Sequence, residues 1–232
     1  PDGRKRMHRF FVFASIALIA LAAPPLQSQD EAPEIATGDL TLVEDKRHTE
    51  IYADPDADWS VYTKILLDPA TVAFRKNWQR DQNRSQPFKI RTEDMERIKS
   101  ELSELFGEVF TTELTEEGGY VMTAESGEDV LRITPHIVDL DVYAPDTRSS
   151  PGMQRSYTES AGRMTLKLQL YDSVTGDLIA VTSDREEAPR RGYLQWTSSV
   201  TNRQEARHLM QRWAKKMRER LDEARTSGTP AN

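Results

Sequence analysis

Residues 162–187 read GRMTLKLQLYDSVTGDLIAVTSDREE, and this stretch has the pattern of a β-hairpin. In its first half, every second residue is apolar and the residues between are mostly polar. The apolar residues are Met164, Leu166, Leu168 and Leu170. A period of two places the apolar side chains on one face of a strand, where they can pack on a core. The polar segment 172–177 supplies turn chemistry, because Gly176 can adopt a positive φ before the return arm of residues 178–184. The rest of the chain is interpreted around this half-buried hairpin.

Two amphipathic segments are predicted to form helices. The first begins with Thr92 as its N-cap and ends at Gly107, and its apolar residues recur at helical spacing: Met95, Ile98, Leu102, Leu105 and Phe106. The second begins with Asn202 as its N-cap, with Glu205 at the capping-box position. Its apolar stripe contains Ala206, Leu209, Met210, Trp213, Ala214, Met217 and Leu221. Each stripe needs a buried surface to pack on.

The remaining strands are predicted from shorter patterns. We expect residues 75–91 to form a surface loop, and we expect strands over residues 61–68, 109–114, 120–123 and 130–143. In the longest strand the apolar residues change face near Pro135, so we expect a β-bulge at residues 135–137. The order of elements predicts an α+β fold, with a single curved, mainly antiparallel sheet and two helices packed on one face.

The N-terminus carries the clearest indication of cellular location. Met7, the expected start of translation, is followed by Arg9 and by the apolar run FFVFASIALIALAA at residues 10–23. This run is shorter than the roughly 20 residues that a membrane-spanning helix needs, and it has the pattern of a secretory signal. We therefore predict a signal peptide over residues 1–28 and a periplasmic location. The alternative is that the segment is retained as an uncleaved anchor helix.

Three further regions follow the predicted signal. Residues 29–58 are rich in acids and contain prolines, and we expect an acidic tether that leads into the domain. The folded α+β domain is expected over residues 59–226, and a disordered tail over residues 227–232. Residues 54–58 read DPDAD, which spaces three carboxylates as a calcium loop does. Trp59 stands where such a loop needs glycine, so we interpret the segment as a turn and predict no metal site.

Composition excludes several classes of function. The chain has a formal net charge of −7 and contains no cysteine. General nucleic-acid binding needs a basic surface, so we expect no nucleic-acid partner. Without cysteine there is no disulfide, no thiol nucleophile, no thiolate metal site and no cysteine-linked lipid anchor.

Motifs that carry catalysis are absent from the sequence. There is no Gly-x-Ser-x-Gly elbow, no phosphate-binding glycine loop and no His-Glu-x-x-His pair, and the four histidines are scattered. His136, beside the expected bulge, is interpreted as a structural histidine. We predict no catalytic residues and no cofactor, and we expect a non-catalytic binding or accessory module whose partner is another envelope protein. Two alternatives stay open: a hydrolase that uses paired carboxylates, and a protein that associates with membranes through its basic last helix.

Aromatic and basic residues in two loops are the weak candidates for binding. Trp78 lies in the basic segment 75–91, where its ring can fill the edge of the domain or contact a partner or glycan. The loop after the hairpin holds a second group, which can receive an anionic group: Arg190, Arg191, Tyr193 and Trp196. The loop at residues 144–160, rich in Ser, Pro and Gly, is long enough to be functional.

Three motifs carry a resemblance to a known family. The opening PDADWSVY at residues 55–62, with ILLDP at residues 65–69, resembles the start of a bacterial envelope family known only as a domain of unknown function, DUF3313. The hairpin turn DSVTG at residues 172–176 and the last helix around Trp213 are also similar to it. The resemblance implies an exported protein, often a lipoprotein, without known catalytic residues. Because this chain lacks the anchoring cysteine, we expect a free periplasmic form.

Overall fold

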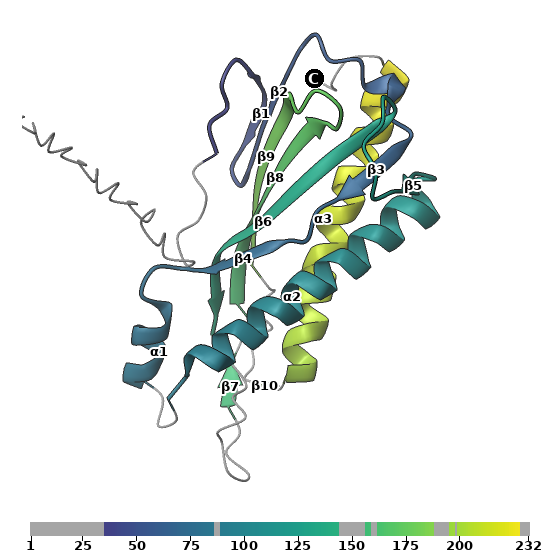
Figure 1. The fold of residues 1–232 in the computed structure, drawn as a ribbon. Helices are drawn as coiled ribbons and strands as arrows, with labels where there is room; N and C mark the ends of the chain where they lie inside the picture. Colours follow the sequence, from purple (N-terminus) through teal and green to yellow (C-terminus); the bar gives the residue numbers. More distant parts are fainter. Residues whose placement is uncertain are drawn as a thin grey trace, which may run out of the picture.

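The computed structural model describes residues 35–85, 89–143, 156–158, 162–187, 195–197 and 199–227. These residues form one mixed sheet of eight strands, three α-helices and a separate two-stranded sheet (Figure 1). The strand order in the large sheet is β1-β2-β9-β8-β6-β3-β5, and β4 also pairs with β6. Most of the pairs are antiparallel, so the predicted α+β fold with a mainly antiparallel sheet is confirmed.

The elements run in this order: β1 (Thr41–Lys46), β2 (Thr49–Ala53), η1 (Trp59–Val61), β3 (Lys64–Leu67), β4 (Thr71–Phe74), α1 (Trp78–Ser85), α2 (Thr92–Thr112), η2 (Glu113–Glu117), β5 (Val121–Met122), β6 (Val130–Val142), β7 (Ser156–Thr158), β8 (Gly162–Asp172), β9 (Leu178–Glu187), β10 (Gln195–Thr197) and α3 (Ser199–Ser227). The small sheet pairs β7 with β10 in antiparallel fashion.

The predicted hairpin is the pair β8–β9 at the centre of the large sheet. Its apolar residues are buried in the core as expected: Met164, Leu166, Leu168 and Leu170. In the turn, Asp172 Oδ1 accepts hydrogen bonds from the backbone N–H groups of Val174 and Thr175, and Gly176 has a φ of 77°. Local turn chemistry therefore fixes the register of the hairpin, as the sequence predicts.

Strand β6 connects the two halves of the sheet. It is antiparallel to β8 and parallel to both β3 and β4. The bulge lies between Val138 and Asp141, not at residues 135–137 as expected, and Asp139 has a φ of 52°. Pro135 is paired with Leu168 of β8 without a bulge, and on the other side of β6 it lies where β3 has ended and β4 has not begun.

Helix α2 is longer than the sequence predicts. The expected C-cap at Gly107 and the expected strand over residues 109–114 are wrong, because the chain stays helical to Thr112 and continues into η2. The apolar stripe of α2 continues with the same helical spacing through Val109, Phe110 and Leu114, all of which are buried. One glycine in an otherwise continuous stripe did not end the helix, since the packing of the following turns offsets its low propensity.

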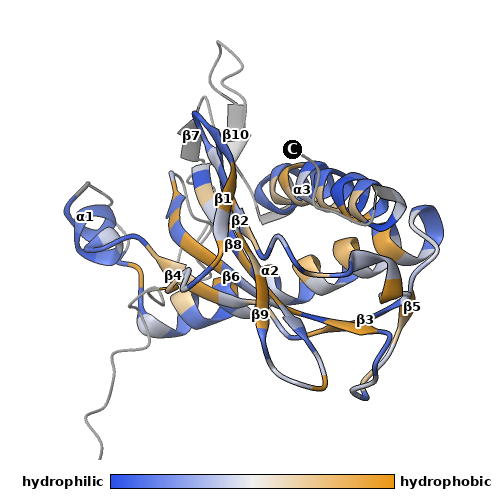
Figure 2. Ribbon diagram, turned by 90° about the horizontal axis from the view of Figure 1, so that it is seen from above, coloured by the Kyte–Doolittle hydropathy of each residue, from blue (hydrophilic) through white to orange (hydrophobic). Residues whose placement is uncertain are grey.

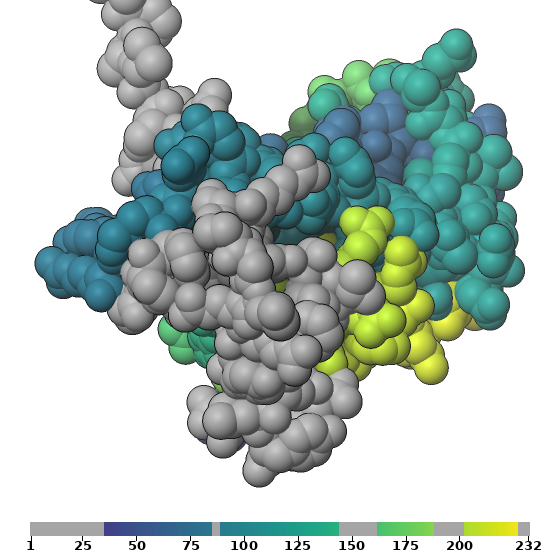
Figure 3. Space-filling view, turned by 90° about the horizontal axis from the view of Figure 1, so that it is seen from below, coloured from purple at the N-terminus to yellow at the C-terminus, as the bar shows by residue number. Residues whose placement is uncertain are grey.

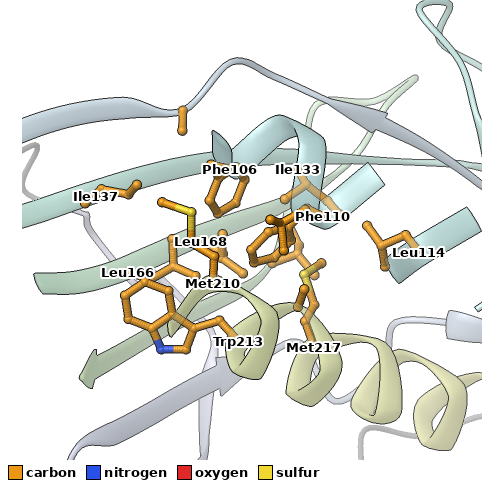
Figure 4. Packing of buried hydrophobic residues seen from close by; sticks show 14 of the residues in the cluster. Phe106, Phe110, Leu114, Ile133, Ile137, Leu166, Leu168, Met210, Trp213 and Met217 are labelled. Carbon is orange, nitrogen blue, oxygen red and sulfur yellow. The ribbon is translucent and has the colours of Figure 1, made fainter. Parts of the chain in front are cut away.

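Helices α2 and α3 cover one face of the sheet, as predicted (Figures 1 and 4). Between them lies the core, in which Phe106 and Phe110 stack with ring centroids 3.9 Å apart. Met210 of α3 lies close to Leu168 of β8, and Trp213 lies beside Leu166, farther from the two rings (Figure 4). Seen from below, the yellow surface of α3 emerges beside the teal surface of α2 (Figure 3). α3 begins at Ser199, three residues before the expected cap at Asn202.

The expected surface loop over residues 75–91 is wrong in its central part, which forms the short helix α1. Trp78 holds this helix to the domain: its ring stacks on Phe74 with centroids 4.2 Å apart, and its Nε1 donates to the carbonyl oxygen of Val142 at 3.1 Å. Gln82 Nε2 donates to the same oxygen. The other faces of α1 are hydrophilic (Figure 2). The segment is therefore anchored by Trp78 together with Gln82.

The expected acidic tether of residues 29–58 also contains structure. Residues 41–53 form the hairpin β1–β2, which pairs with β9 and extends the sheet at one edge. The turn predicted at residues 54–58 is present, because Asp54 Oδ1 accepts from the N–H of Asp56 and Asp58 Oδ1 accepts from the N–H of Ser60. The sequence hides the hairpin because its few apolar residues stand among charged ones.

Candidate ligand-binding groove

A groove of about 530 Å³ lies between helix α3 and strands β1, β2, β9 and β8. This volume falls in the range of roughly 300–1,000 Å³ that is typical of small-molecule sites. We refer to it as the α3 groove. Its floor and wall are mainly aliphatic, with Ile51, Leu166, Leu168 and Leu170 from the sheet and Met217, Leu221 and Ala224 from the helix.

The groove follows from the sheet being wider than the helix that covers it. Leu166 to Leu170 face α3 because of their period of two along β8, and the groove-lining residues of α3 recur at spacings of four and three residues. Ala53 and Ala180 are paired across β2 and β9 and both line the groove. Two methyl groups at this place leave space that larger side chains would fill.

Two tryptophans in the groove carry indole N–H groups without an acceptor. Trp59 and Trp213 both line the groove and are only 5% and 3% exposed. Neither Nε1 has a hydrogen-bond partner among the described residues. In Figure 4 the Trp213 nitrogen is turned away from the phenylalanines of α2. Buried indole N–H groups usually find an acceptor, and an unsatisfied one costs about 1–3 kcal/mol. Two of the side chains that line the groove therefore carry a buried donor that lacks an acceptor.

Ion pairs connect α3 to the strands on the other side of the groove. Arg220 Nη2 lies 2.7 Å from Glu44 Oε2 of β1. Lys216 Nζ lies 3.1 Å from Asp184 Oδ2 and 3.1 Å from Glu186 Oε1, both of β9. We refer to these three contacts as the mouth pairs. They hold the helix and the β1–β2–β9 edge together above an apolar interior.

Two members of the mouth pairs, Glu186 and Lys216, have shifted pKa values. Burial raises the pKa of the Glu186 carboxyl, but hydrogen bonds from Arg212 and Lys216 outweigh burial and hold this pKa below its usual value. Burial lowers the pKa of the Lys216 ammonium, and its bonds to Asp184 and Glu186 more than compensate, so this pKa is raised. Glu186 and Lys216 are therefore both charged at neutral pH.

The groove has no cation reserved for an anionic ligand among the described residues that line it. Lys216 and Arg220 are engaged in the mouth pairs, and Lys46 Nζ lies 3.2 Å from Glu44 Oε1. The carboxylates of Glu219 and Glu223 also line the groove. A phosphate or free carboxylate would meet at least as many acids as bases, so the electrostatics favour a neutral ligand.

A second, smaller cavity of about 100 Å³ lies between the first halves of α2 and α3 and the ends of β6 and β8. Beside it, the buried Asp141 is neutralised by two arginines: Arg75 Nε lies 3.0 Å and Arg163 Nη2 lies 3.2 Å from its carboxylate oxygens. The backbones of Gly162 and Asp141 also lie close together, and a Cβ at residue 162, with its φ of 145°, would lie 2.2 Å from the carbonyl oxygen of Asp141. We interpret this region as a structural cluster.

The hydrolase alternative needs a carboxyl whose pKa is raised. Among the described carboxyls, each one with a clearly shifted pKa lies below its usual value: Asp58, Asp81, Asp129, Asp172 and Glu186. Within the part of the chain that the structure describes, no cluster of three or more metal-ligating side chains occurs. His136 has the structural role that the sequence suggests, with Nδ1 2.7 Å from Thr71 Oγ1 and Nε2 3.0 Å from Gln169 Oε1.

Of the binding residues predicted from the sequence, Trp78 is the one whose side chain the structure describes. Trp78 is 1% exposed and fills the edge of the domain, which is the first of the two roles that the sequence suggests for it. Arg190, Arg191 and Tyr193 lie outside the described residues. Trp196 belongs to strand β10, where it pairs with Tyr157 of β7, and its side chain is not described. Most of the loop at residues 144–160 likewise lies outside the described residues, as do the predicted signal peptide and the C-terminal tail from residue 228.

The sequence contains part of the groove without revealing it. Trp213, Met217 and Leu221 belong to the predicted apolar stripe of the last helix, but periodicity indicates only which face of a helix is apolar. Whether another element fills the space opposite that face depends on the width of the sheet. Nothing in the sequence around Trp59 indicates that it lines a groove, because it is recognisable only as the residue that follows the turn at Asp58.

Comparison with solved structures finds distant likenesses. A protein from Caulobacter crescentus CB15 assigned as a lipoprotein is 13% identical with a TM-score of 0.36, over 75% of this chain and 98% of that one. The PelC dodecamer from Paraburkholderia phytofirmans is 8% identical with a TM-score of 0.32, over 71% of this chain and 93% of that one. A DUF330 protein from Xanthomonas campestris is 12% identical with a TM-score of 0.33, over 70% and 86%. Because these TM-scores are below 0.5, no function is transferred from these proteins to this chain.

Among curated proteins, none matches the chain. The helices of the described residues include none with the length and apolarity required to cross a membrane. A family model matches residues 39–217, a range that extends from just before β1 into α3 and spans the whole large sheet. The chain therefore belongs to the family described as Protein of unknown function (DUF3313).

Proposed function

We propose that this protein is an exported, non-catalytic binding module of the cell envelope that holds an apolar ligand in the α3 groove. The observation that carries the proposal is the presence, in one aliphatic groove of about 530 Å³, of two buried N–H donors without acceptors. A space that served packing alone would be closed by larger side chains at Ala53 and Ala180. A bound group would supply both the missing contacts and the missing acceptors.

The sequence supports the location in the envelope. The apolar run at residues 10–23 follows basic residues, as in secretory signals, and the chain has no cysteine for a lipid anchor. A partner in the envelope, such as another exported protein, would then deliver or receive the ligand. Fractionation of cells that produce the full-length chain tests this part: recovery in the periplasmic fraction is expected, and recovery in the cytosol would contradict it.

Charge pairing makes membrane association through the last helix the weaker alternative. Its basic residues are engaged with acids: Arg207 with Glu108, Arg212 with Glu186, Lys216 with Asp184 and Glu186, Arg218 with Glu113 and Arg220 with Glu44. Binding to anionic lipid requires a face of one sign. Flotation with anionic vesicles is therefore expected to leave the protein unbound.

A fluorescent apolar probe tests the groove itself. N-phenyl-1-naphthylamine, whose emission rises in apolar surroundings, should bind the purified protein with a saturable signal. Ala180→Leu places a larger side chain in the groove floor and should weaken this binding at least tenfold. The control Val174→Leu also introduces a leucine, at a position that is 59% exposed in the hairpin turn, and should bind like wild type. Equal binding by both variants, with unfolding curves that show both folded, would contradict the proposal.

A further inference from the structure

We infer that the ligand of the α3 groove is a neutral long-chain acyl ester of a lipid, whose chain lies along α3 and whose carbonyl oxygen accepts the indole N–H of Trp213 or Trp59. The inference rests on the proposed binding function and adds the chemical class of the ligand. It combines three properties of the groove: an elongated aliphatic lining, two buried neutral donors, and a mouth without an uncommitted cation among its described residues.

The lining fits an alkyl chain better than a compact ring. Along α3 it extends from Trp213 to Ala224, which at the helical rise of 1.5 Å per residue is roughly 16 Å. The opposite side follows β8 from Leu166 to Leu170 and β2 at Ile51. The apolar side chains of this lining, apart from the two tryptophans, are aliphatic or thioether groups, and charged side chains such as Lys216 and Arg220 stand beside them. A flexible linear chain can contact such a surface along its whole length, and each methylene that it buries adds to the binding.

The two donors specify the polar part of the ligand. An indole N–H can only donate a hydrogen bond, so the matching group is an acceptor. Because the donors are neutral and buried, a neutral acceptor can enter without the desolvation cost of an ion. An ester carbonyl meets this condition and is attached directly to an alkyl chain.

The charges at the mouth argue against an ionised head group inside the groove. Three bases line the groove, Lys46, Lys216 and Arg220, beside four acids, Glu44, Asp184, Glu219 and Glu223. Each of the three bases has a carboxylate partner within 3.2 Å. A fatty-acid carboxylate or a phosphate would have to displace one of these pairs. A neutral ester places its polar end beneath the pairs and leaves them intact.

Two matched lipids test the acceptor. A monoacylglycerol and the monoalkylglycerol ether of equal chain length differ only in the carbonyl group, and each is titrated against bound N-phenyl-1-naphthylamine on the intact protein. The ester should displace the probe about tenfold more effectively than the ether, because a hydrogen bond in a buried site contributes about that factor. Equal displacement by the two lipids would overturn the inference.

Substitution of the donors identifies their contribution. Trp213→Phe and Trp59→Phe keep an aromatic ring and remove the N–H, so at least one of them should reduce the preference for the ester to less than about threefold. The matched control Trp78→Phe removes an N–H that donates to Val142, away from the groove, and should keep the tenfold preference. If the probe binds but neither lipid displaces it, the acyl ester is refuted while the groove still binds apolar compounds. If the probe itself does not bind to wild type, both proposals fail.

Discussion

Helix α3 packs on two sides, and the two sides differ in how completely their space is filled. Towards α2, Met210 and Ala214 are fully buried against the layer that holds the stacked Phe106 and Phe110. Towards β1, β2 and β9, the same helix borders a groove of about 530 Å³. Ion pairs connect the helix to β1 and β9 at the mouth of this groove. One continuous apolar stripe thus serves a closed core on one side and an open space on the other. Apolar character alone therefore does not distinguish a packing surface from a binding surface.

The largest expected effect is on the closed side. Phe110→Ala removes a fully buried ring and leaves a cavity, so the free energy of unfolding should fall by about 3–5 kcal/mol. Val121→Ala is a control at a position that is 58% exposed and should change it by less than about 0.5 kcal/mol. Denaturant unfolding measures both. A loss below about 1 kcal/mol for Phe110→Ala would mean that the core is not closed.

The second prediction compares the two buried indoles directly. Trp78→Phe loses a hydrogen bond and leaves the Val142 carbonyl with one donor fewer, whereas Trp213→Phe removes an N–H that has no acceptor. Both substitutions remove the same atoms, so their cavity costs are similar. Trp213→Phe should therefore be less destabilising by about 1–3 kcal/mol.

Thermal and denaturant unfolding of the two tryptophan variants measure this difference. Their far-UV spectra should match that of the wild type, which shows that each fold is intact. Equal losses of stability would mean that the Trp213 N–H finds an acceptor, and the distinction between the two sides of α3 would then disappear.

The smallest effect concerns the mouth pairs. The pKa of Glu186 lies below its usual value of 4.5 in the folded protein, so its contribution to stability is present above that value and is lost as the pH falls through the folded-state pKa. Glu186→Gln should therefore lower stability by about 1 kcal/mol or less at pH 7. The difference from wild type should shrink towards zero at pH values well below 4.5.

A control for this pH dependence is Glu116→Gln, at an exposed position in η2. It should match the wild type across the whole pH range. A Glu186→Gln difference that stays constant down to strongly acid pH would show that the carboxylate charge does not contribute to the mouth pairs.

Periodicity predicted the parts of the fold in which one face is buried and the other is not. The β8–β9 hairpin and the apolar stripe of α3 are such cases, and both lie where the sequence places them. The prediction failed where one residue was given too much weight. Gly107 suggested the end of a helix, although Val109, Phe110 and Leu114 continue its stripe.

The hairpin β1–β2 and the groove could not be predicted for a different reason. Strand β1 is mostly exposed and charged, so its sequence lacks the apolar alternation of a half-buried strand. Its position at the edge of the sheet depends on pairing between β2 and β9, which are far apart in the sequence. The groove exists only because this edge extends past α3, and the missing acceptors for Trp59 and Trp213 are a property of the tertiary structure.

The indole N–H resonances in heteronuclear NMR spectra test the central claim most directly. Trp→Phe variants assign the signals, and the monoacylglycerol is then added to the intact protein. The account predicts that the Trp213 or Trp59 signal moves downfield as its N–H gains an acceptor, while the Trp78 signal, already bonded to Val142, stays in place. Saturation with lipid that leaves both groove tryptophans unshifted would contradict the claim that the α3 groove is a binding site.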